Sequence, residues 1–206
     1  MFRFACLVLT ICAAQGFQQE SNPTDAVREK DAYAIYSLML TNPRTSHGPD
    51  DNERYLIAGT TAPPYPPEPC VRPPKERDAD FRQVLADYER RKATPRQLKR
   101  FLSISKPYVL LTADQKQEFI KSRSLGRKIG SDAESEQFRG VTDLFTLSDV
   151  YFNERRTLAL TAISTWCGSL CAQYQWKVFE KLDTGKWEER QWISCFTIAK
   201  NSDPRH

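Results

Sequence analysis

Apolar residues recur at helical spacing near the start of the chain. Residues 25–40, DAVREKDAYAIYSLML, place five of them on one face: Ala32, Ile35, Tyr36, Met39 and Leu40. This spacing predicts a helix, which Thr24 can cap and which Asn42-Pro43 ends because proline cannot continue it.

A second apolar stripe predicts another helix, which begins near Glu76. Its members are Phe81, Val84, Leu85 and Tyr88. Their spacing of three and four residues puts them on one face of a helix.

Residues 94–102 carry the signals of a third, short helix. Thr94 can act as its N-cap, Pro95 suits the first turn because its missing N–H would be unpaired there, and Gln97 completes a capping box. The buried face would consist of Leu98, Phe101 and Leu102. Farther along, Thr112 is placed to cap one more helical turn, which runs to Phe119.

Runs rich in β-branched and aromatic residues predict the strands. Two lie at residues 54–61 and 108–112, and four follow in the last third, at residues 147–153, 158–165, 173–182 and 187–196. Tyr174, Trp176 and Val178 alternate with polar residues, which indicates a strand with one buried face. Gly185, in the sequence DTGK, is placed to take the left-handed conformation of a tight hairpin.

These elements predict an α+β fold, with N-terminal helices packed on a C-terminal antiparallel β-meander of about four strands. The core of the meander should contain Trp176, Val178, Phe152, Leu158 and Leu160, whereas Trp187, next to the hairpin turn, could lie partly exposed. We expect a single domain over residues 25–200, between a flexible segment at 17–24 and a tail at 201–206. Within it we expect a proline-rich connector at 62–74 and a mobile, charged loop at 121–137.

Residues 1–16, MFRFACLVLTICAAQG, have the pattern of a secretory signal peptide. Arg3 precedes an uncharged apolar run from Phe4 to Ala14, which is too short to span a bilayer as a helix. Small residues at Ala14 and Gly16 fit cleavage after Gly16. The alternative, a buried N-terminal strand or helix, rarely lies this close to a chain start. We therefore expect a secreted or periplasmic protein with no membrane span after signal removal.

The charge balance of the chain implies no polyanionic partner. The sequence has 30 Lys and Arg residues against 26 Asp and Glu residues, a net charge of +4. One basic stretch stands out, with Arg82, Arg90, Arg91, Lys92, Arg96, Lys99, Arg100 and Lys106. Nucleic-acid binding is one interpretation of it, and export favours the other, a solvated helix face. We therefore expect no nucleic-acid partner.

Four cysteines would remain after signal removal: Cys70, Cys167, Cys171 and Cys195. An even number in an exported chain favours disulfides, with connectivity left open. Cys167 and Cys171 lie four residues apart between two predicted strands, and a local structural disulfide between them is the simplest interpretation. Redox pairs normally have the spacing Cys-x-x-Cys at a helix N-terminus, so a thiol–disulfide redox protein is a weaker alternative. Cys195 could instead be a reduced buried thiol.

Signatures of catalysis or metal binding are few. The sequence contains no nucleophile elbow, zinc-protease helix, P-loop or dinucleotide fingerprint. Its histidines, His47 and His206, lie in a polar loop and at the C-terminus, where they suit neither a catalytic base nor a zinc ligand. Clustered carboxylates at Glu180, Glu188 and Glu189, and at Asp132, Glu134 and Glu136, are typical of solvated surface. We expect no catalytic residue, cofactor or metal.

The segment from Leu147 to Ser194 resembles a pattern in uncharacterised exported bacterial proteins of the acidobacterial type. The matching residues are Ser148, Phe152-Asn153, Cys167-Gly168, Cys171 and Gly185-Lys186-Trp187. The chain departs from that pattern at Ala172, where a second glycine is common, and at residues 181–184, which lengthen the turn. The resemblance implies bacterial export and a shared β-meander, with no known activity.

These observations together favour an exported, non-catalytic binding or interaction protein. A protein or peptide ligand is one option, because the proline run could dock in an aromatic groove, although such runs more often pack as connectors on their own domain. The alternative function is a small extracytoplasmic hydrolase that uses dispersed carboxylates. A deep cleft lined with buried Asp or Glu would favour the hydrolase.

Overall fold

The computed structural model describes residues 23–41, 43, 53–67, 71–124, 138–168, 171–193 and 197–199. The expected signal peptide, Cys70, Cys195 and both histidines lie outside these ranges. The helices are α1 (Pro23–Thr41), α2 (Asp78–Arg91) and α3 (Ala113–Ser124), with a 3-10 turn at Lys75–Arg77. The strands are β1 (Tyr55–Ala58), β2 (Tyr108–Leu111), β3 (Leu144–Leu147), β4 (Tyr151–Phe152), β5 (Leu158–Gly168), β6 (Cys171–Lys181), β7 (Trp187–Arg190) and β8 (Thr197–Ala199).

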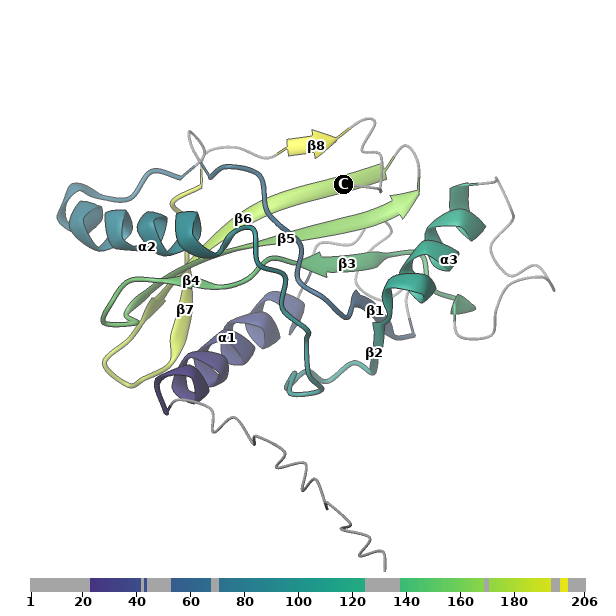
Figure 1. The fold of residues 1–206 in the computed structure, drawn as a ribbon, viewed down its shortest axis with the longest axis horizontal. Helices are drawn as coiled ribbons and strands as arrows, with labels where there is room; N and C mark the ends of the chain where they lie inside the picture. Colours follow the sequence, from purple (N-terminus) through teal and green to yellow (C-terminus); the bar gives the residue numbers. More distant parts are fainter. Residues whose placement is uncertain are drawn as a thin grey trace, which may run out of the picture.

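All eight strands belong to one mixed sheet, which confirms the α+β fold class (Figure 1). The strand order is β2-β1-β3-β5-β6-β7, with β4 paired to β5 and β8 paired to β6. β1 runs parallel to both β2 and β3, and the other pairs are antiparallel. The predicted meander of about four strands is therefore too small, because short strands from the first half of the chain extend the same sheet.

The β5–β6 hairpin forms the centre of the sheet, since both strands are 11 residues long and pair along nearly their whole length. All five expected core residues are buried, at 3% exposure or less. Trp187 is also buried, at 7%, so the expectation of partial exposure is wrong. Gly185 has φ of +79°, as the hairpin turn requires.

Helices cover both faces of the sheet. Side chains alternate between the two faces along each strand. Leu158, Leu160, Trp176 and Val178 pack with α2 residues. Farther along the same face, Leu144 and Trp166 pack with α3 residues. Ala159, Ile163 and Phe179, at the intervening positions, pack with α1 on the opposite face.

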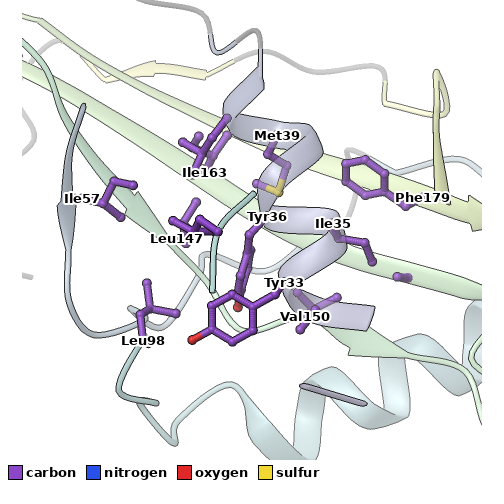
Figure 2. Packing of buried hydrophobic residues seen from close by; sticks show 14 of the residues in the cluster. Tyr33, Ile35, Tyr36, Met39, Ile57, Leu98, Leu147, Val150, Ile163 and Phe179 are labelled. Carbon is purple, nitrogen blue, oxygen red and sulfur yellow. The ribbon is translucent and has the colours of Figure 1, made fainter. Parts of the chain in front are cut away.

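The apolar face of α1 is the one that the sequence predicts, since Ala32, Ile35, Tyr36, Met39 and Leu40 are all buried. Figure 2 shows Tyr36 and Met39 directed toward Leu147 and Ile163 on the sheet. The Tyr36 hydroxyl donates to the carbonyl of Ser148 at 2.8 Å, so the buried phenol has a partner. The helix begins at Pro23, one residue before the cap expected at Thr24.

The prediction of a short helix at residues 94–102 is wrong, because the structure has no helix there. The backbone N–H of Arg96 donates to Oγ1 of Thr61, and that of Leu98 donates to the carbonyl of Gly59. These hydrogen bonds to the segment after β1 replace the ones that a helix would make. Leu98 is still buried, but Phe101 is 60% exposed.

The helix expected after Thr112 is present and longer than predicted. Thr112 and Gln115 form a capping box, in which each backbone N–H donates to the other side chain. α3 continues to Ser124, four residues into the segment expected to be a mobile loop. The rest of that loop, residues 125–137, lies outside the described residues.

Candidate functional site

A cavity of about 360 Å³ lies on the sheet face between the residues packed on α2 and those packed on α3. Its floor contains Ala162 and Ser164 from β5 and Ala172 from β6. Neighbouring positions on the same face carry large residues such as Leu160 and Trp166. The small side chains leave space that neither helix fills, and we call this space the sheet cavity.

The start of the proline-rich connector forms one wall of the sheet cavity, through Pro63, Pro64 and Tyr65. In Figure 1 the coloured part of the chain that follows β1 passes over β5 and β6. The connector is held before this wall, where the Ala62 N–H donates to the carbonyl of Leu147 at 2.9 Å. It is held again after the wall, where the backbone N–H of Arg72 donates to the carbonyl of Trp192 at 2.8 Å. Prolines restrict the backbone between these points, so the wall is preformed.

Two polar groups that line the sheet cavity have no hydrogen-bond partner among the described residues. They are the indole N–H of Trp166, which is 6% exposed, and the buried hydroxyl of Tyr174. The backbone of Tyr65 opposes the rise in the pKa of that hydroxyl that burial causes. Burial raises the pKa of Tyr174, so the hydroxyl is protonated at neutral pH. Buried donors usually have a partner in folded proteins, so an acceptor group placed in this cavity would find two donors ready to bond to it.

Lys116 of α3 contributes a positive charge to the lining. The side chain is half-buried, and burial lowers its pKa. Within the described part of the chain no carboxylate pairs with it, in contrast to Lys177 and Lys181, which bind Glu189 and Asp31 at 2.7 Å. Lys116 is therefore a partly desolvated cation beside an apolar hollow.

Four buried carboxylates form ion pairs outside the cavity lining: Asp31, Asp80, Asp87 and Asp149. Asp149 is bound by Arg91 and Arg96, each at 2.9 Å, and Asp87 is bound by Arg28 at 2.6 Å. None of the described residues that line the sheet cavity is acidic. A cleft lined with buried carboxylates would favour a hydrolase, and the described lining of this cavity does not have that composition.

The basic stretch at residues 82–106 is largely used in similar pairs. Five of its eight basic residues form ion pairs: Arg90, Arg91, Lys92, Arg96 and Lys99. The expected solvated helix face is therefore only part of its role, because Arg91 and Arg96 also hold α2 and the following segment against the sheet.

Cys167 and Cys171, the predicted disulfide candidates, are bonded to each other at the end of the β5–β6 hairpin, with Cα atoms 5.2 Å apart. Trp166 and Ala172 of the cavity lining directly flank the two cysteines. Gly168, between them, has φ of +130°, a conformation that residues other than glycine rarely adopt. The disulfide therefore closes the hairpin next to the sheet cavity.

A second, wider hollow of about 760 Å³ follows the outer side of α1, near Leu38 and Phe101. Its buried polar groups have partners. Tyr33 accepts a hydrogen bond from the Lys99 N–H, and the Trp187 N–H donates to Asp31. The sheet cavity, whose donors are unpaired, is the stronger candidate site.

No pattern in the sequence marks Lys116, Trp166 or Tyr174 as site residues. Trp166 stands beside Cys167 of the predicted disulfide, but no spacing rule links these residues to α3 or to the proline-rich connector. Two small residues at alternate positions of β5, Ala162 and Ser164, were the one local signal for a hollow.

Comparison with known proteins identifies no relative: no protein-family model, curated protein or solved structure matches the chain. None of the described helices has both the length and the apolar composition needed to cross a membrane. Within the same described ranges, no group of three or more His, Cys, Asp or Glu side chains is arranged to hold a metal ion.

Proposed function

We propose that the protein is an exported binding protein that holds a small, mostly apolar molecule in the sheet cavity. The observation that carries this proposal is the unpaired indole N–H of Trp166 in the wall of a preformed hollow. Ligand sites typically combine apolar walls with a few well-placed polar groups. The sheet cavity has this composition and lies at the small end of the usual size range, about 300–1,000 Å³.

The alternative, a hydrolase that uses dispersed carboxylates, has less support. Asp31, Asp80, Asp87 and Asp149 are each bound by lysine or arginine side chains. These contacts hold the carboxylates in structural ion pairs away from the cavity lining.

Export is supported by the signal-like N-terminus and by the Cys167–Cys171 disulfide, since disulfides persist mainly in oxidising compartments. The resemblance to exported bacterial proteins agrees with a secreted or periplasmic location. Intact-mass measurement of protein from the envelope of the native host should find a chain trimmed near Gly16. A cytoplasmic species that retains Met1 would contradict export.

Ligand binding can be tested with N-phenyl-1-naphthylamine, an uncharged probe that fluoresces in apolar surroundings. We expect saturable binding that Ser164→Leu abolishes, because the larger side chain would fill the cavity floor. Gln175→Leu adds the same side chain to the opposite face of β6 and should leave binding unchanged. Equal binding by both variants would place the probe elsewhere and contradict the proposed site.

A further inference from the structure

We infer that the sheet cavity takes an organic anion, a compact apolar molecule with one acidic group bound beside Lys116 and Trp166. This inference rests on the proposed function and names the class of ligand. Three properties of the lining support it: the hydrogen-bond donors, the positive charge and the apolar residues.

Two polar groups of the lining can donate hydrogen bonds but cannot accept them. Lys116 has an ammonium group with three donors and no acceptor, and the Trp166 indole has one donor and no acceptor. Thr146, Ser164 and Tyr174 carry hydroxyls that can adapt to either role. The Ser148 hydroxyl is already used, since it donates to the carbonyl of Asp149 and accepts from the N–H of Ala162. A ligand group that complements this set must accept hydrogen bonds, and a carboxylate accepts several at once.

The charge of the lining favours an acidic ligand group. Lys116 is half-buried, and no ion pair joins it to another of the described residues. Burial of a charge is unfavourable unless the charge is paired. The depressed pKa of Lys116 is the expected result of that burial in the ligand-free protein. An acidic ligand group would remove this cost and gain a charge-assisted hydrogen bond.

The rest of the lining is suited to an apolar body. Ile120 of α3, Leu144 of β3 and the rings of Pro63 and Pro64 face the same hollow as Ala162. Trp166 is fixed in position, since its ring packs against Phe119 at 5.8 Å between centroids and its strand position pairs with Leu144. Its N–H is therefore a preorganised donor, and a preorganised site loses less entropy on binding.

The inference can be tested with two isosteric compounds, 1-naphthylacetate and 1-naphthylacetamide, by isothermal titration calorimetry on the full mature chain. Hydrogen bonds to a charged group contribute enough for the acid to bind about tenfold or more tightly than the amide. Lys116→Gln should abolish this preference and Lys116→Arg should retain it. Lys121→Gln is the matched control, because it removes a positive charge from an exposed position of the same helix.

A second pair of variants tests the indole N–H. Trp166→Phe should weaken binding of the acid more than binding of the amide. Trp176→Phe is its control, since Trp176 also has a buried N–H without a partner but does not line the cavity.

The outcomes separate this inference from the proposed function. Suppose that the acid and the amide bind with equal affinity and both displace N-phenyl-1-naphthylamine. This result would overturn the inference that the ligand is an anion and would leave the proposed binding site intact. An acid preference that survives in Lys116→Gln would equally overturn it. Failure of all three compounds to bind would overturn both proposals. A preference lost in Lys116→Gln, and kept in Lys116→Arg and Lys121→Gln, would support it.

Discussion

Arg91 and Asp149, 58 residues apart in the sequence, are joined by two hydrogen bonds to one carboxylate oxygen. Nε and Nη2 of Arg91 donate to Oδ2 at 3.0 and 2.9 Å. Asp149 is only 2% exposed, and its other oxygen accepts from Arg96 at 2.9 Å. The pair therefore attaches the end of α2 to the turn between β3 and β4.

Asp149→Ala should lower the free energy of unfolding by about 3–5 kcal/mol, because it leaves two arginines without their buried partner. Urea denaturation measures this change. Glu89→Ala is the control, since it removes the exposed partner of Lys92 and should change stability little. Similar losses in both variants would show that the burial of Asp149 does not determine its contribution.

Protonation of Asp80 at low pH should remove part of the stability of the protein. Burial alone would raise the pKa of its carboxyl, but hydrogen bonds from Arg155 and Asn153 and the charge of Arg77 lower it below the usual 3.8. A group with a depressed folded-state pKa stabilises the protein above its unfolded pKa, and this contribution is lost as the pH falls through the folded value.

Asp80→Asn should therefore lose less stability than the wild type between pH 6 and pH 3. Unfolding midpoints in urea at the two pH values provide the comparison. If the variant and the wild type show the same pH dependence, the ion pairs of Asp80 are not the source of acid sensitivity.

Trp176→Ala should cost about 3–5 kcal/mol, the usual range for a buried aromatic residue. The indole is 3% exposed and lies 5.9 Å from the Tyr88 ring and 6.1 Å from the Tyr174 ring, between α2 and the sheet. Leu182→Ala, at a position 38% exposed, should have a much smaller effect. An unchanged unfolding midpoint in Trp176→Ala would contradict its place in the core.

The Cys167→Ser/Cys171→Ser double variant should fold, lose modest stability and keep its ligand binding. Loop entropy alone gives so small a ring less than the roughly 3 kcal/mol estimated for a 15-residue loop. Trp166 would still be held by Phe119 and by pairing with β3. The bond itself is tested by counting free thiols, under denaturing conditions, in protein isolated from the native host. Two free thiols, or a bond from either cysteine to Cys70 or Cys195, would refute the pairing.

Local patterns in the sequence were sufficient for much of the fold. The apolar face of α1, the capping box at Thr112, the alternation in β6 and the left-handed Gly185 each depend on residues within a few positions of one another. The local disulfide belongs to the same class. Such features are determined by residues that are close together in the sequence, and the structure confirms them.

Tertiary contacts decided the rest. Residues 94–102 carry helix signals, but hydrogen bonds to Gly59 and Thr61 hold them extended. Parallel pairing of β1 with β2 and β3 depends on partners some 50 or more residues away, which no local pattern specifies. The sheet cavity is likewise non-local. Small residues on β5 and β6 become a hollow because α2 and α3 pack on either side of them. Lys116 joins Trp166 in the lining of that hollow only after α3 has docked on the sheet.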